Sequence, residues 1–326
     1  MTLPARLLVL HLGSIGELVD ALPFAAAVED ERPDVHLGWV SEPVVEALLA
    51  GHPCLERVHL WRRGGGLGEL TRLVRELRAE RYELAVDLSP SRKSALLARL
   101  AGLPRVTGGG RRRTREAGWS WSEGRIATGH GDVHRAEGYL ELATQLGCPA
   151  SAPRHVLPRD AAAEAWAEER VRALGGAPVL VHLGASKPEN RWDPERFGAL
   201  ARALADAKAF PVCLTGGPAD RVRVVAGMAM SPDVHDLVGA LSLAQFVALA
   251  RRSRLFVGGE TGPMHVAAAV GTPVVALFGP AEPARVRPWG EGHRVLRGRS
   301  MRMEDIEVEE ALACVQRHLG LERALR

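Results

Sequence analysis

Short apolar runs typical of strands alternate with stretches of helical periodicity along the whole sequence, and this alternation constrains the fold more than any other feature. In the first half, Leu70, Leu73, Val74 and Leu77 have the spacing of one helix face. The strands expected here are Leu7–His11, Val35–Val40 and Leu84–Leu88, and the helices run from the Gly13–Gly16 loop to Ala27, around Leu70–Leu77 and over Ala95–Leu100. Such alternation predicts a parallel sheet covered by helices, with right-handed crossovers.

The second half restarts the pattern after an interruption by Pro149, Pro153 and Pro158. Its expected strands are Val179–His182, Val212–Thr215, Leu255–Val257 and Val274–Phe278, and its expected helices are Ala161–Leu174, Ala244–Ala250, Met264–Val270 and Met303–Leu319. A chain of 326 residues is long enough for about two domains. We therefore predict an α/β protein of two facing Rossmann-like domains with parallel sheets, residues 1–158 and 159–326, with a cleft between them.

Charge and composition indicate which kinds of ligand and partner to expect. The net charge of +3 is too small to indicate a nucleic-acid binder, so no nucleic-acid partner is expected. Arg62 and Arg63 form one basic cluster and the run from Arg105 to Arg115 forms another, and such clusters attract anionic ligands. The four cysteines are scattered, the N-terminus does not resemble a signal peptide, and no apolar stretch is long enough to span a bilayer. We expect a cytoplasmic protein that can still work at a membrane surface.

Two glycine-containing loops follow expected strands and precede helices. Gly258–His265 has Pro263 at the first helical turn, where its missing N–H is not needed, and a helix that starts there can hold a phosphate. An ordinary tight turn is the alternative. The Gly13–Glu17 loop lacks the third glycine and the downstream acid of a dinucleotide fingerprint, so a dehydrogenase is not favoured. Glu17 is either a general base or an acid that stabilises a helix N-terminus.

A third loop, Gly184–Trp192, follows the strand that ends at His182. Its small and polar residues are suited to a nucleotide, with Lys187 or Arg191 neutralising a diphosphate. The Gly216–Asp220 loop has the same position after the next strand. His and Asp are closely spaced at His130–His134, but no further ligand is indicated nearby, so no metal site is expected.

Taken together, these motifs resemble the lipopolysaccharide heptosyltransferases of glycosyltransferase family 9, and the resemblance covers nearly the whole chain. The residues that carry it are Gly259–Ala269, Gly271–Pro280, Asn190–Trp192, Pro194–Phe197 and Gly239–Leu243. The resemblance implies a GT-B fold, an ADP-heptose donor, inversion at the anomeric carbon, and neither a metal nor another cofactor. It is closest to the first heptosyltransferase, which adds heptose to the acidic sugar Kdo of lipid A, so a lipid-linked acidic sugar is the expected acceptor and contact with the inner membrane surface is possible.

The resemblance also implies roles for individual residues. Glu17 matches the catalytic base. The donor-binding positions of the second domain are Ser186, Asn190, Arg191, Asp220, Leu241, Glu260, Thr261, Gly262 and His265. The acceptor-binding positions of the first domain are Arg62, Arg63, Lys93, Arg115 and His134.

Three positions depart from the family pattern. Glu replaces the usual Asp at 17 and 260, and Asn190 replaces a donor-binding Lys, which removes a charge that would stabilise a diphosphate leaving group. These departures leave open two alternatives to a heptosyltransferase. One is a non-catalytic nucleotide-sugar-binding protein, and the other is a nucleotide-sugar epimerase or hydrolase of the same fold.

Overall fold

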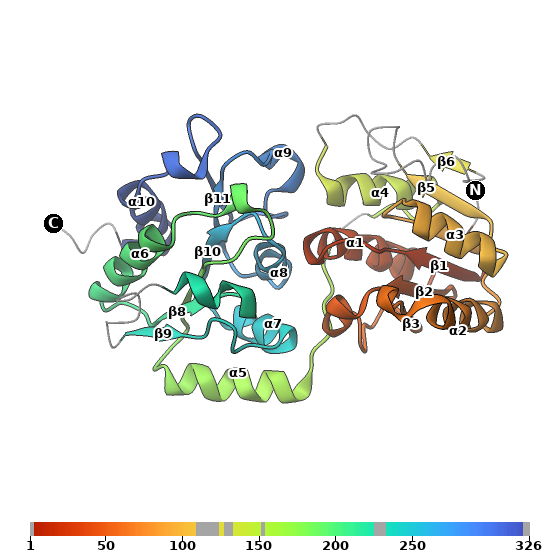
Figure 1. Cartoon of the computed structure of the whole chain (residues 1–326), viewed down its shortest axis with the longest axis horizontal. Coiled ribbons are helices and arrows are strands. Elements are labelled where there is room, and N and C mark those ends of the chain that lie inside the picture. Colours follow the sequence, from red (N-terminus) through yellow and green to blue (C-terminus); the bar gives the residue numbers. More distant parts are fainter. Residues whose placement is uncertain (1–2, 109–123, 127–132, 151–153, 225–232, 322–326) are drawn as a thin grey trace. The chain divides into compact units, whose positions relative to one another are not determined.

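The computed structural model describes residues 3–108, 124–126, 133–150, 154–224 and 233–321. The chain divides into two compact units, Met1–Pro158 and Arg159–Arg326, and each is described by itself (Figure 1). Each unit contains one parallel sheet with helices on both faces, as the alternation in the sequence predicts.

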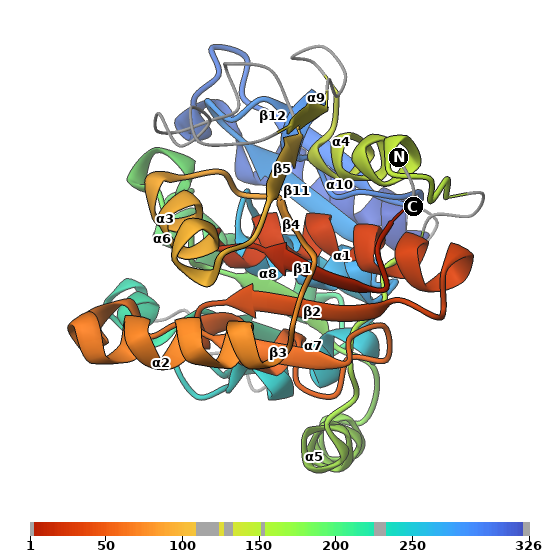
Figure 2. The same cartoon turned by 90° about the vertical axis from the view of Figure 1, so that its right-hand side faces the viewer.

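The first unit is built on a six-stranded sheet with the order β3-β2-β1-β4-β5-β6. Its strands are β1 (Arg6–Leu10), β2 (His36–Ser41), β3 (Arg57–Leu60), β4 (Leu84–Asp87), β5 (Arg105–Gly108) and β6 (Gly124–Ile126). Its α-helices are α1 (Ile15–Glu31), α2 (Gly66–Ala79), α3 (Arg92–Ala101) and α4 (Arg135–Gln145), with 3₁₀ turns at Pro43–Leu48 and Arg63–Gly65. Helices α1 and α4 pack side by side (Figure 2). Helix α2 packs with α3. The alternate strand residues Leu8 and Leu10 belong to the core formed with α2 and α3.

The second unit is built on another six-stranded sheet, with the order β12-β11-β10-β7-β8-β9. Its strands are β7 (Val179–His182), β8 (Val212–Thr215), β9 (Val234–Asp236), β10 (Leu255–Gly259), β11 (Val274–Phe278) and β12 (Arg294–Arg297). Its α-helices are α5 (Ala161–Ala173), α6 (Pro194–Asp206), α7 (Leu243–Arg251), α8 (Gly262–Ala269), α9 (Pro283–Val286) and α10 (Val308–Leu319), with 3₁₀ turns at Pro188–Asn190, Pro218–Arg223 and Met303–Asp305.

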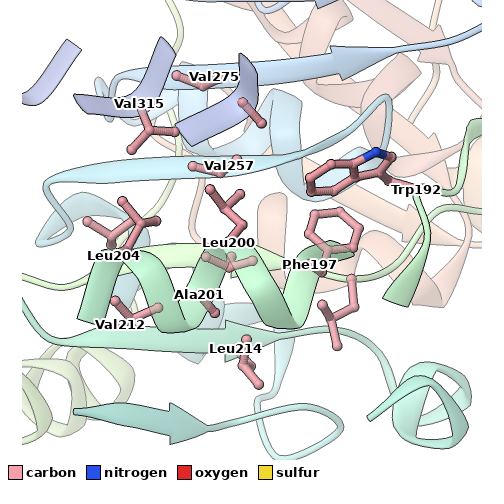
Figure 3. Close-up of a cluster of buried hydrophobic side chains, with 14 of the residues drawn as sticks. Trp192, Phe197, Leu200, Ala201, Leu204, Val212, Leu214, Val257, Val275 and Val315 are labelled. Carbon is pink, nitrogen blue, oxygen red and sulfur yellow. The ribbon is translucent and has the colours of Figure 1, made fainter. Parts of the chain in front are cut away.

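The core of the second unit lies between the sheet and the pair α6 and α10. Figure 3 shows Phe197, Leu200 and Leu204 of α6 packed toward Val257 and Val275 of the sheet. Burying a side chain of this size contributes about 1.5–3 kcal/mol relative to leaving it exposed. This packing holds the carboxyl ends of the central strands in place, and the loops that follow them are the candidate binding loops.

The structure corrects the prediction of one continuous helix over Met303–Leu319. Met303–Asp305 forms a 3₁₀ turn, Ile306 is extended, and α10 begins only at Val308. The backbone carbonyl of Ile306 accepts hydrogen bonds from the indole N–H of Trp192 at 3.0 Å and from the guanidinium of Arg196. The Ile306 carbonyl is therefore hydrogen-bonded to side chains far away in the sequence and not to a backbone N–H of a helix.

The structure contains five short strands that the sequence did not predict, namely β3, β5, β6, β9 and β12. Four of them are the outer strands of the two sheets, where one side of the strand is unpaired within its sheet. Each of the five strands is only three or four residues long and includes a charged residue, so no continuous apolar run marks them; the charged residues include Arg57, Arg105, Arg125, Asp236 and Arg294. Pairing with a neighbouring strand, rather than local hydrophobicity, makes these segments strands.

Candidate functional site

The first candidate site is on the first unit, at the carboxyl ends of β1 and β4. The chain runs outward from β1 through β2 and β3 on one side and from β4 through β5 and β6 on the other. This is a topological switch point, and ligands of open α/β sheets bind outside the carboxyl ends of strands at such points. The loop after β1 contacts the loop after β4, because the backbone N–H of Leu12 donates to the hydroxyl of Ser89 at 2.6 Å.

Glu17 lies in the first turn of α1, at this edge. Ser14 is the N-cap of the helix, and its backbone N–H donates to Oε2 of Glu17 at 2.9 Å, which completes a capping box. The Glu17 side chain is 18% exposed. The carboxylate therefore stabilises the helix N-terminus, as one of the two interpretations expects, and it also stays accessible at the switch point, as a general base requires.

Arg135, the first residue of α4, extends to the same carboxylate. Its guanidinium lies 3.7 Å from Oε1 of Glu17 and donates to the buried carboxylate of Asp20 at 2.8 Å. His134, expected on the acceptor side, is buried, and its Nδ1 accepts the backbone N–H of Ala136 at 3.2 Å as the N-cap of α4. His134 thus fixes the start of the helix that carries Arg135.

The basic residues expected to bind the acceptor differ in how the structure presents them. Arg62 follows β3, is 63% exposed, and lies 3.9 Å from Oε1 of Glu69. Lys93 is exposed in the first turn of α3, after β4, and Arg63 opens the 3₁₀ turn after β3. Arg62, Arg63 and Lys93 therefore follow the carboxyl ends of strands in the same sheet as β1. Arg115 lies outside the described residues.

The second candidate site is at the corresponding switch point of the second unit, between β7 and β10. The side-chain amide of Asn190 is buried and donates to Oε2 of Glu260 at 2.7 Å. Nε2 of His265 lies 3.9 Å from Oε1 of the same carboxylate. Two of the three positions that depart from the family pattern are thus in direct contact, and Glu260 joins the loop after β7 to the start of α8.

Helix α8 begins at this switch point. Thr261 is its buried N-cap, Gly262 is its first residue, and Pro263 follows in the first turn, as the sequence predicts. A helix N-terminus carries a partial positive charge and directs backbone N–H groups outward, which suits an anionic ligand. Leu241 is half-buried just before Ser242, the N-cap of α7.

The loop after β7 is held against the loop after β8. A methyl group added to Gly184 would lie 2.3 Å from Oδ2 of Asp220, so a larger residue there would force the Asp220 carboxylate to move. The same carboxylate oxygen accepts the backbone N–H of Gly217 at 2.9 Å. Nε of Arg191 donates to the carbonyl of Ala185 at 2.8 Å. Ser186 is exposed in this loop.

Two histidines at the ends of the central strands were not among the expected site residues. His182 ends β7 and its Nδ1 lies 3.1 Å from the hydroxyl of Thr215, and burial lowers its pKa to about 4 although the Asp220 carboxylate favours the protonated form. His11 follows β1, and burial lowers its pKa to about 4 while Glu17 opposes the change and Arg135 adds to it. The sequence signal was available, because the first strand of each half runs directly into a histidine.

Two absences concern only the part of the chain that the structure describes. Within those residues, no three His, Cys, Asp or Glu side chains gather as ligands of one metal ion. His130 and Asp132 lie outside that part. None of the described helices has both the length and the apolar character needed to cross a bilayer.

Comparisons with known proteins agree with this architecture. The family model for glycosyltransferase family 9 (heptosyltransferase) matches residues 70–316. Lipopolysaccharide heptosyltransferase 3 of Escherichia coli is 30% identical over 289 residues, which are 84% of this chain and 83% of that protein. A family 9 glycosyltransferase from Veillonella parvula superposes with a TM-score of 0.85 at 21% identity, covering 97% of both chains.

Escherichia coli heptosyltransferase WaaC, solved with ADP, superposes with a TM-score of 0.81 at 20% identity, covering 96% of this chain and 99% of that one. The structural neighbours confirm the predicted α/β fold of the GT-B class with two parallel sheets. The family model spans well over half of the chain and agrees with the sequence relatives. The chain is a glycosyltransferase and belongs to glycosyltransferase family 9, the heptosyltransferases.

Proposed function

We propose that this protein transfers a heptose-type sugar, with inversion, from an ADP-sugar to an acidic sugar of the lipopolysaccharide inner core. The acceptor is lipid-linked, so the reaction takes place at a membrane surface. Family membership and the names of the relatives support heptose transfer to lipopolysaccharide. The observation that carries the finer proposal is Glu17, an accessible carboxylate fixed at the switch point of the first sheet.

Glu17 is the general base in this proposal. Its carboxylate takes the proton of the acceptor hydroxyl as that oxygen attacks the anomeric carbon of the donor. The ADP leaving group departs from the opposite side of that carbon, which gives inversion. The N–H of Ser14 and the guanidinium of Arg135 hold the two carboxylate oxygens, which supports a fixed orientation for proton transfer.

The donor is proposed to bind the second unit. The N-terminus of α8 holds the diphosphate of ADP through backbone N–H groups. Asn190 and His265 fix the Glu260 carboxylate, which accepts hydrogen bonds from sugar or ribose hydroxyls. Because Asn190 is neutral and is hydrogen-bonded to Glu260, the positive charge for the leaving group comes from Arg191 in the same loop.

The acceptor is proposed to bind the first unit. Arg62 and Lys93 are exposed cations after strands of the sheet that carries Glu17, and they attract the carboxylate of an acidic sugar. Arg63 and Arg115 belong to the same proposed set. His134 acts indirectly, by holding the start of α4 and therefore Arg135.

Acceptor-dependent release of ADP tests the proposal. We expect ADP-heptose to be consumed only when Kdo-containing lipid A is present, and the new glycosidic bond to have the anomeric configuration opposite to the donor's. NMR of the product measures that configuration. Turnover of the donor without any acceptor indicates an epimerase or hydrolase, and tight donor binding without turnover on any acceptor indicates a non-catalytic binding protein. Either result rejects the proposal.

A further inference from the structure

Four buried polar atoms on one face of the first sheet have no hydrogen-bonding partner among the residues that the structure describes. They are Nδ1 and Nε2 of His11, Nε1 of Trp39 and Oγ of Ser41, and all three residues are fully buried. The register pairs Val9 with Trp39, and His11 and Ser41 each follow two residues later. Because side chains alternate along a strand, the three side chains share one face of the sheet.

The His11 imidazole lies close to the Glu17 carboxylate. A methyl group built on Gly13 would be 2.6 Å from Oε2 of Glu17 and 3.1 Å from Nε2 of His11, so the glycine leaves room for both groups to approach from one side. The rings of His11 and Trp39 have centroids 6.2 Å apart. The imidazole is therefore near both the indole and the carboxylate.

Buried polar atoms in folded proteins almost always have a partner, and several unpaired ones in a single place indicate an internal water site. The atoms here include the indole N–H as a donor, the Ser41 hydroxyl as a donor or acceptor, and the imidazole as one donor and one acceptor. A water molecule needs two to four polar partners, and this group supplies them.

We propose that His11 is a positioning residue for Glu17, and that it acts through an internal water held by His11, Trp39 and Ser41. The neutral imidazole accepts a hydrogen bond from that water or donates one to it, and the water donates to the Glu17 carboxylate. This inference rests on the proposed role of Glu17 as the base. The other charged groups at this place are Arg135 of α4, which lies beside Glu17, and Asp20 of α1, which is paired with Arg135.

The pH dependence of kcat/KM tests this role in the full chain. His11→Leu removes both ring nitrogens, so the ionised carboxylate loses a hydrogen bond, and we expect the acid limb of the profile to move up by about one pH unit. The plateau rate should fall less than tenfold, because the base is still present, and the KM for ADP-heptose should not change. His11→Gln keeps a donor and an acceptor and should leave the limb within a few tenths of a unit of the parent.

A purely structural role for His11 predicts a lower melting temperature and an unmoved acid limb, and that result overturns the inference. If His11→Leu does not fold, Ser41→Ala replaces it as the test variant, and an unmoved limb counts against the inference in the same way. Glu17→Gln separates the two proposals. If it loses activity while the limb of His11→Leu stays in place, only the positioning role fails, and if it keeps parental turnover, the proposed base fails as well.

Discussion

Replacing Glu17 with glutamine removes the proposed proton acceptor while keeping the size and most of the contacts of the side chain. A glutamine at this position can still accept the N–H of Ser14, because the third position of a capping box takes either Glu or Gln. The charge contact with Arg135 at 3.7 Å is lost, but Arg135 keeps its ion pair with Asp20. The perturbation therefore concerns proton transfer far more than folding.

The two expected effects differ widely in size. General-base catalysis supplies about 10²–10⁴-fold in rate, which corresponds to about 3–5 kcal/mol of transition-state stabilisation. The Glu17–Arg135 pair joins side chains that are 18% and 19% exposed, and such pairs contribute about 0.2–1 kcal/mol to stability. For a unit of this size, that corresponds to a fall of about 4 °C or less in melting temperature.

The assay is acceptor-dependent ADP release by purified parent and variant, with calorimetry of ADP binding and a melting curve for each. We expect kcat to fall 10²–10⁴-fold, with ADP affinity unchanged. Glu31→Gln, at the exposed end of the same helix, is the matched control and should behave as the parent. Glu17→Asp should keep substantial activity, because a carboxylate remains. Parental turnover by Glu17→Gln refutes the assignment of the base.

Four further predictions concern the donor, the acceptor and stability. ADP should bind with the same affinity in EDTA and in magnesium, measured by calorimetry, and binding that requires magnesium contradicts the role given to the α8 N-terminus. Lys93→Ala should raise the acceptor KM and weaken its dependence on salt without changing ADP affinity, and a salt-independent KM in the parent argues against an acidic acceptor. Leu200→Ala should lower the free energy of unfolding in urea by about 2–5 kcal/mol, whereas the exposed Leu67→Ala should change it by less than about 0.5 kcal/mol. Stability should fall as the pH drops from 6.5 toward 4, because His11 and His182, with pKa values of about 4, stay neutral in the folded chain while the unfolded chain takes up protons. Urea midpoints across that range measure the effect, and a flat profile refutes it.

The strand-to-helix turns were predictable from the sequence because their determinants are local. In the segment from Leu255 to Ala269, an apolar run is followed by Gly258 and Gly259, then by an N-cap position and Pro263, and the structure has β10 and α8 there. The loop that holds Glu17 was predicted because Gly13 and Gly16 follow an apolar run. The capping box that Ser14 and Glu17 form there was found only in the structure. Family motifs then indicated which of these turns bind ligands.

The surroundings of those turns were not predictable, because they depend on residues far apart in the chain. Arg135 hydrogen-bonds Asp20 across 115 positions of sequence. The helix expected at Met303 begins late for a similar reason, because the Ile306 carbonyl accepts the indole N–H of Trp192 from 114 positions away. Periodicity within a segment contains no information about such partners.

By itself, the sequence determined the alternation of strands and helices, the parallel α/β class, the family and the position of the candidate carboxylates. These follow from patterns of burial and turn chemistry that operate over a few residues. Only the tertiary structure decided which side chains surround each carboxylate. It put His11, Gly13 and Arg135 around Glu17, and Asn190 and His265 around Glu260. The physical reason is that parallel strands bring their carboxyl ends to one edge whatever their separation in sequence, so the contacts made at that edge depend on strand order.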